Sequence, residues 1–125
     1  MELIPKDHNT ILELIGRVEN QLVQSQTFTE LEPDLQKFIT VWQEVIAPHF
    51  EAEETGLYPD AASEDGDTGR LVLALIEEHQ IMTHTFRHLI KAFEQKDVPI
   101  IISYGIVICD MLREHIKKEQ EKLGR

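Results

Sequence analysis

The sequence predicts an all-α fold, an antiparallel up-down-up-down four-helix bundle that forms one domain over residues 1–125. Apolar residues recur at helical spacing in four long segments, and short stretches rich in turn-forming residues separate these segments. A chain of 125 residues can form one core but is too short for two domains of ordinary size. Because short connections join helices of similar length, helices that follow one another should pack antiparallel.

The first two helices are expected at about residues 6–25 and 32–55. The apolar stripe of the first segment contains Ile4, Ile11, Leu12, Ile15, Leu22 and Val23. That of the second contains Leu35, Phe38, Ile39, Trp42, Val45 and Ile46. Pro33 stands near the start of the second helix, where a proline is tolerated. The Gly-, Asp- and Ser-rich stretch that follows predicts a mobile, acidic loop over 56–68.

The last two helices are expected at about residues 69–95 and 99–122. The stripe of the third contains Val72, Leu75, Ile76, Met82, Phe86, Leu89, Ile90 and Phe93. Pro99 opens the fourth helix, and its stripe contains Ile101, Tyr104, Ile108, Met111 and Leu112. Taken alone, residues 100–102 (Ile-Ile-Ile) would also fit a strand.

The charge of the chain excludes several classes of partner. It has 23 Asp and Glu against 12 Lys and Arg, a net charge of −11, which repels nucleic acid and acidic lipid surfaces. The longest apolar runs fall short of the roughly 18–20 residues that cross a bilayer, so no membrane partner is expected. The single Cys109 forbids an intrachain disulfide and favours a reducing compartment, so we expect a cytoplasmic protein. Cys109 lies off the apolar stripe of its helix. The sequence indicates no particular protein partner.

Four of the six histidines lie on the apolar stripes of their helices, one on each helix. These are His8, His49, His79 and His115. Each lies about 16 or 17 residues from the end of the bundle where the first helix finishes, or about 24–26 Å along the axis. A single histidine on an apolar stripe is more often a core residue than a ligand. Four in one layer, all pointing inward, indicate a metal site.

Two carboxylates join this layer, because Glu53 and Glu119 follow His49 and His115 by one helical turn. A charged carboxylate in a bundle interior is costly, whereas carboxylates and neutral imidazoles around divalent cations offset one another. Nitrogen and oxygen donors without a thiolate suit Fe, Mn or Zn. The predicted metal ligands are His8, His49, Glu53, His79, His115 and Glu119.

An internal repeat indicates two metal ions rather than one. The pair His49 and Glu53 recurs as His115 and Glu119 66 residues later, each followed by Leu57 or Leu123. Asp7-His8 is echoed by Glu78-His79 71 residues later. Each helical hairpin therefore supplies one lone histidine and one His-Glu pair, which predicts two metals about a pseudo-two-fold axis.

Other polar residues near the site have simpler interpretations. Glu51 and Glu54 are expected to face solvent, and Thr83 takes the inward position one turn after His79. His84 and His88 lie about 140° and 180° from His79 on an ideal helix, which indicates surface residues. A local widening of the helix could bring His84 inward. Trp42 and Tyr104 lie several turns from the layer and are expected to fill the core.

The segment His49-Phe50-Glu51-Ala52-Glu53-Glu54-Thr55-Gly56-Leu57-Tyr58-Pro59 resembles the H-F/H-x-x-E-E-x-x-L-F/Y-P signature of the hemerythrin-like (HHE cation-binding) family. With the other His and Glu pairs, the resemblance covers essentially the whole chain. It implies two iron ions, Fe2+ or Fe3+, with an oxo or hydroxo bridge, although Mn or Zn also suits the donors. The four histidines would be terminal ligands, Glu53 and Glu119 would bridge the ions, and O2 or another small ligand would bind at an open position. A bound O2 would be reduced to the peroxide level. Pro48 agrees with the family, which often has a proline before this histidine.

Two departures from the family pattern bear on function. Oxygen-carrying hemerythrins have a fifth histidine where this chain has Thr83, and the second motif continues Glu119-Gln120 where relatives often have two glutamates. Fewer nitrogen ligands weaken the case for reversible oxygen carriage. We expect a protein that binds O2 or a related diatomic for sensing, storage or delivery. The alternatives are an enzyme that reduces NO, O2 or peroxide, an iron donor for iron-sulfur cluster repair, and a structural bundle without metal.

Overall fold

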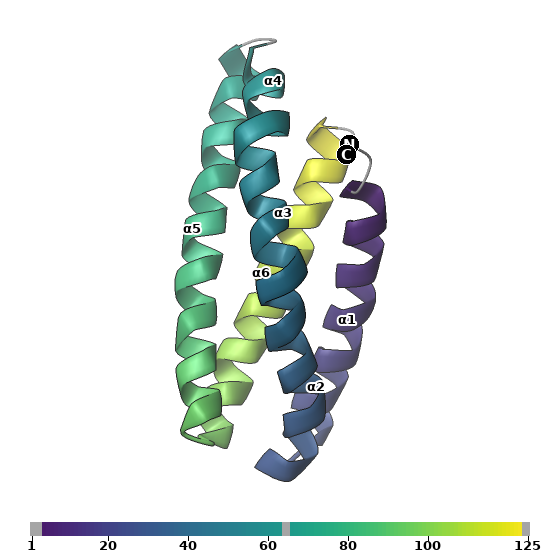
Figure 1. Ribbon diagram of the computed structural model, residues 1–125, viewed down its shortest axis with the longest axis vertical. Helices are drawn as coiled ribbons and strands as arrows, with labels where there is room; N and C mark the ends of the chain where they lie inside the picture. The colour runs from purple at the N-terminus through teal and green to yellow at the C-terminus, as the bar shows by residue number, and fades with distance from the viewer. Residues whose placement is uncertain (1–3, 64–65, 124–125) are drawn as a thin grey trace.

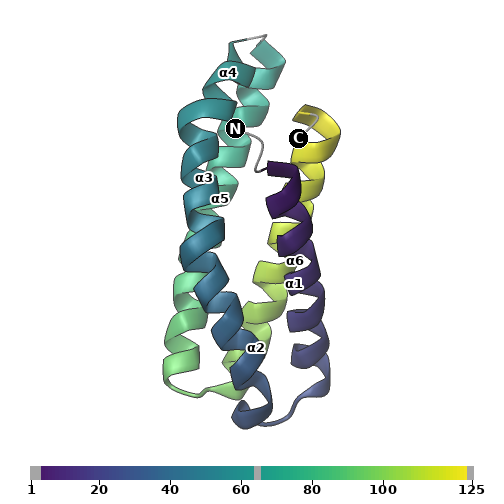
Figure 2. The ribbon, with the colours of Figure 1, turned by 45° about the vertical axis from the view of Figure 1, so that its right-hand side comes forward.

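The chain folds into four helical rods that lie side by side (Figures 1 and 2). The structure, a computed structural model, describes residues 4–63 and 66–123, with side chains from His8 onward. The first rod is α1 (Ile4–Gln24), the third is α5 (Gly66–Glu94) and the fourth is α6 (Val98–Leu123). Rods that follow one another along the chain run in opposite directions, which confirms the predicted up-down-up-down bundle.

The second rod is one long helix with two wider turns, and it runs from Phe28 to Ala62. Its parts are α2 (Phe28–Val41), the π-turn η1 (Trp42–Ile46), α3 (Ala47–Ala52), the π-turn η2 (Glu53–Leu57) and α4 (Tyr58–Ala62). The rod begins four residues before the predicted start, because Thr27 and Glu30 form a capping box. Thr27 Oγ1 accepts from Glu30 N–H at 3.3 Å, and Glu30 Oε1 accepts from Thr27 N–H at 3.1 Å. Pro33 therefore lies inside α2.

Each π-turn stands directly before a proline, Pro48 or Pro59. In the turns the backbone bond spans five residues, from Ala47 N–H to Trp42 O and from Tyr58 N–H to Glu53 O. A proline ring inside an α-helix collides with the carbonyl four residues earlier, and a wider turn moves that carbonyl aside. The rod therefore passes both prolines without ending, and the predicted loop over 56–68 is wrong for residues 56–62 and 66–68, which are helical; residues 64 and 65 lie outside the described residues. Helix α4 extends to Ala62, and α5 begins at Gly66.

The connection between α5 and α6 is a tight turn. Lys96 has a positive φ of 56°, and Asp97 N–H donates to Ala92 O at 3.0 Å. Asp97 Oδ1 accepts from Ile100 N–H at 3.3 Å, which caps the first turn of α6. Residues 100–102 are consequently helical, and the strand alternative for them is wrong.

The buried apolar residues form two clusters. The larger one draws on all four rods and includes Ile15, Leu35, Phe38, Trp42, Phe86, Leu89 and Leu112. The smaller one consists of Tyr58, Ala61, Val72 and Leu75, where α4 packs on α5. Along α5, His79 lies between the members of the two clusters, so the predicted polar layer separates them. No helix among the described residues is long and apolar enough to cross a membrane.

Two residues differ from their predicted positions on the helices. Val23, assigned to the stripe of the first helix, is 76% exposed near the end of α1. Cys109, predicted to lie off the stripe, is buried in the larger cluster. Helix α6 packs against both α1 and α5, so it buries a wider face than a single stripe and includes Cys109 in it.

Candidate metal centre

The six predicted ligands meet in one buried layer, and all four rods contribute to it. His8 comes from α1, His79 from α5, and His115 and Glu119 from α6, while the second rod supplies His49 and Glu53. His49, the most exposed of the six, is only 7% exposed. The apolar stripes carry these polar residues into the interior because each lies in register with the apolar residues of its own rod.

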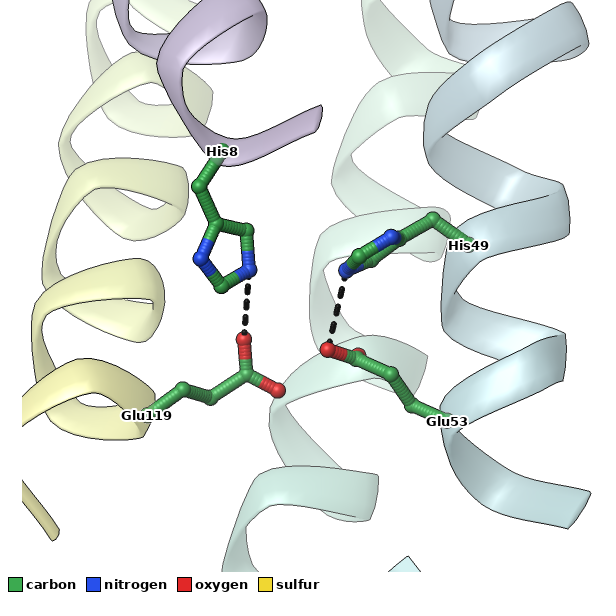
Figure 3. A group of neighbouring side chains, drawn as sticks. All are labelled: His8, His49, Glu53 and Glu119. Atoms are coloured by element: carbon green, nitrogen blue, oxygen red, sulfur yellow. Dashed lines mark ion pairs between the residues drawn. The ribbon is translucent and has the colours of Figure 1, made fainter. Parts of the chain in front are cut away.

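The donor atoms form two groups that share both carboxylates. One consists of His8, His49, Glu53 and Glu119, and the other of Glu53, His79, His115 and Glu119. Within each group one donor atom per residue lies within 4.8 Å of all the others. Figure 3 shows the first group, with both imidazoles turned toward the carboxylates between the rods.

Each carboxylate directs one oxygen to each group. Glu53 Oε2 lies 2.9 Å from His49 Nε2, while Glu53 Oε1 lies 3.1 Å from His79 Nε2. Glu119 Oε1 lies 3.2 Å from His8 Nε2, and Glu119 Oε2 lies 3.6 Å from His115 Nε2. This arrangement suits two cations, each of which would be held by two of the imidazoles and would share Glu53 and Glu119 with the other.

The polar atoms of the layer fit a metal better than they fit one another. Both ring nitrogens of His8 and the Oε2 atom of Glu53 are buried and have no hydrogen-bond partner among the described residues. His8 Nε2 is near Glu119, but the contact lacks hydrogen-bond geometry. Buried groups of this kind are costly unless they are paired or bind a metal. The donor set of nitrogens and carboxylate oxygens therefore fits a metal centre.

The pKa values of two groups follow from this crowding. Burial alone would raise the pKa of Glu119, but the hydrogen bond and charge of His115 hold it well below its usual range. Burial alone would lower the pKa of His115, but Glu119 and Glu78 raise it above its ordinary value. Without metal, therefore, the site keeps Glu119 ionised and favours a protonated His115.

Two further carboxylates support the imidazoles of the second group from outside. Glu54 Oε2 lies 2.7 Å from His79 Nδ1, and Glu78 Oε1 lies 2.8 Å from His115 Nδ1. Glu78 also binds Lys118. An Nδ1–H that donates to a carboxylate leaves Nε2 free of a proton and directed at the metal position. The expectation that Glu54 only faces solvent is therefore wrong, because its partly exposed side chain reaches across to α5.

Tyr58 was missing from the predicted set, yet its hydroxyl lies at the centre of the second group. Tyr58 Oη is 2.5 Å from Glu119 Oε2, 3.2 Å from Glu53 Oε1, 3.2 Å from His79 Nε2 and 3.3 Å from His115 Nε2. On an ideal α-helix, Tyr58 would lie about 140° around from Glu53. The π-turn η2 brings it to the same face. The signal was in the sequence, as the Tyr-Pro that ends the quoted motif.

Burial raises the pKa of Tyr58 far above its ordinary value, and the charges of Glu119 and Glu53 raise it further. The phenol is therefore protonated in the metal-free site and donates its hydrogen bond to a carboxylate. In this state the Tyr58 hydroxyl partly offsets the cost of burying Glu119.

The two other histidines, which the sequence placed outside the site, lie outside it. His84 and His88 are exposed, with 3.2 Å between their Nε2 atoms, and His88 stacks on Tyr104. Trp42 is buried and stacks on Phe86. Thr83 is half-buried and lines a groove of about 370 Å³, together with Ala47, Phe50, Glu51, Glu54, His79, Gln80 and Arg87. This groove brings solvent close to His79. The side chain of Asp7, which the repeat pairs with Glu78, lies outside the described residues.

Comparison with known proteins identifies one family. The model of the hemerythrin HHE cation binding domain matches residues 1–125. No curated protein and no solved structure matches this chain. The matched domain binds cations, which agrees with the buried layer of histidines and glutamates.

The outer carboxylates yield a first prediction. Glu54→Ala removes the acceptor that orients His79, so we expect metal affinity to fall about 10–100-fold while the fold is kept. Glu51→Ala is the matched control, because Glu51 is an exposed glutamate three residues away. Competition with a chelator measures both affinities. Equal affinities in the two variants would show that Glu54 does not support the site.

The raised pKa of His115 yields a second prediction. A metal must displace the proton of His115, so affinity is low below that pKa and rises as the pH increases through it. Each displaced proton contributes up to about tenfold per pH unit. Chelator competition between about pH 5 and pH 8 measures this slope. Affinity independent of pH across this range would contradict the prediction.

Proposed function

This chain belongs to the family of hemerythrin HHE cation-binding domains, and on that premise we propose that it is a non-haem di-iron protein. In this proposal the two irons, with an oxo or hydroxo bridge, bind O2 or a related diatomic for sensing, storage or delivery. The observation that carries the proposal is the pair of four-residue groups that share Glu53 and Glu119.

The donor chemistry suits iron, but the affinity of these donors alone does not distinguish iron from manganese or zinc. Four imidazoles and two carboxylates suit Fe, and they also suit Mn and Zn. The family resemblance favours iron, and two redox-active ions would supply the electrons for a small ligand. His8, His49, His79 and His115 would be the terminal ligands, and Glu53 and Glu119 the bridges. A reducing cytoplasm, which the single cysteine favours, would keep the iron available in the ferrous state.

Access to the layer supports a small ligand rather than a large substrate. The groove beside His79 and Thr83 has a volume of about 370 Å³, and Phe50 stacks on the His79 ring at 3.8 Å between centroids. A second cavity of about 180 Å³ lies beside His115 and Met82. Phe50, which is 7% exposed, covers one face of the His79 ring, so the groove approaches the layer without opening it widely, and this favours a small ligand.

A second candidate function is an enzyme that uses the same centre to reduce NO, O2 or peroxide, or that donates iron for iron-sulfur cluster repair. One observation favours it over reversible oxygen carriage. Thr83 stands where a fifth histidine would bind, so fewer nitrogen ligands would hold the ions and more positions would stay open to water or substrate.

The predicted ligands can be tested by metal content. His49→Ala or Glu53→Ala removes a donor from one or both groups, so we expect most of the bound metal to be lost while helicity is largely kept. Iron per chain, by elemental analysis, and circular dichroism are the two measurements. His88→Ala is the matched control and should leave the stoichiometry unchanged, because His88 is exposed on α5. His84→Ala should behave like His88→Ala.

Exposure of the di-ferrous protein to O2 separates the candidate functions. A binding protein should develop a visible absorption band that disappears when O2 is removed. An enzyme should consume NO or peroxide steadily when an electron donor is supplied. Two results together would contradict both candidate functions: no bound metal after purification and reconstitution, and a stability that chelators do not change. The chain would then be a structural helical bundle.

A further inference from the structure

Tyr58 is the one residue of the layer whose role neither the family pattern nor the pair of donor groups explains. We propose that Tyr58 binds, through Oη, the metal ion held by His79 and His115, as a fifth protein ligand at that position only. This inference rests on the proposed metal centre, and it adds a residue that distinguishes the two metal positions.

The position of the hydroxyl leaves few alternatives. Tyr58 Oη lies 2.5–3.3 Å from donor atoms of all four residues of the second group. Nitrogen and oxygen ligands lie about 2.0–2.2 Å from a bound metal such as zinc. The hydroxyl thus stands among the donors where an ion would be held. An ion that enters this group must either expel Tyr58 or bind it.

The packing of the ring opposes expulsion. Tyr58 is 0% exposed, and its ring lies in the smaller apolar cluster with Ala61, Val72 and Leu75. The ring also stacks on His79, with 5.4 Å between centroids and 26° between planes. Its backbone N–H is fixed to Glu53 O by the π-turn. A small shift of the hydroxyl toward the edge of the group disturbs this packing much less than removal of the whole ring.

Binding through Oη requires the loss of one proton and no change in electron count. The O–H bond breaks, the oxygen keeps the electron pair, and one lone pair forms the bond to the metal. Glu119 Oε2, at 2.5 Å, is the nearest acceptor for the proton, which then passes to water. A cation among the ligands stabilises the phenolate for the same reason that it deprotonates a bound thiol or water.

The internal repeat explains why only one position gains this ligand. Leu57 corresponds to Leu123, so Tyr58 corresponds to Gly124, which has no side chain. The chain has only two tyrosines, and the other, Tyr104, stacks on the exposed His88. The first group, with His8 and His49, therefore has no tyrosine of its own.

The test uses the full-length chain, freed of metal, reconstituted with ferrous iron and oxidised in air. A tyrosine bound to ferric iron gives a phenolate-to-iron absorption band in the visible region, and resonance Raman excitation in that band enhances phenolate ring vibrations. We expect wild type to show both, Tyr104→Phe to keep both, and Tyr58→Phe to lose both while it retains iron.

Each result of this test has one interpretation. Phenolate vibrations in wild type and in Tyr104→Phe assign the ligand to Tyr58 even where Tyr58→Phe fails to fold or to hold iron, since the chain has no third tyrosine. Iron-loaded wild type without phenolate vibrations would overturn the inference and leave the proposed function intact. A chain that binds no iron at all would overturn the proposed function as well, and the iron content separates these two results.

Discussion

The burial of two carboxylates between four rods is the constraint on which the rest of the structure depends. Glu53 and Glu119 are each 1% exposed, and two negative charges at such depth are costly unless cations or donors surround them. Imidazoles and the Tyr58 hydroxyl offset part of that cost in the metal-free layer. A pair of divalent ions would offset the rest and would tie all four rods together, since α1, the second rod, α5 and α6 each contribute a ligand. The net charge of −11 also attracts cations toward the bundle.

The two prolines of the second rod have a structural effect that extends to the site. Each would break a regular α-helix, and each is accommodated by a π-turn directly before it. The second of these turns joins Glu53, a predicted metal ligand, to Tyr58, whose hydroxyl lies among the same group of donors. A regular helix would turn Tyr58 away from the second group. The Tyr-Pro pair thus affects the chemistry of the layer as well as the path of the chain.

The sequence predicts the bundle and the six buried donors because both depend on periodicity, which is a local property. His8 and His79 could be assigned to one layer from helix length alone. The residues that were missed depend on deviations from regular geometry or on neighbouring rods. Tyr58 lies in the site because of the π-turn, and Glu54 reaches His79 because α5 packs beside the second rod. Cys109 is buried because α6 contacts two rods. Residue positions calculated for a single ideal helix include neither π-turns nor contacts with neighbouring rods.

The two proposed metal positions would differ in the groups that surround them, although the repeat makes their predicted ligands alike. At the second position, carboxylates of Glu54 and Glu78 accept from the Nδ1 atoms of both imidazoles, which makes these imidazoles better electron donors. At the first position, Nδ1 of His8 has no such acceptor among the residues that the structure describes. With Tyr58 added, the second ion would be the more electron-rich and the more fully coordinated of the two. The first ion would then keep more open positions than the second, so a small ligand that enters beside His79 or His115 would have to pass the second position to reach them.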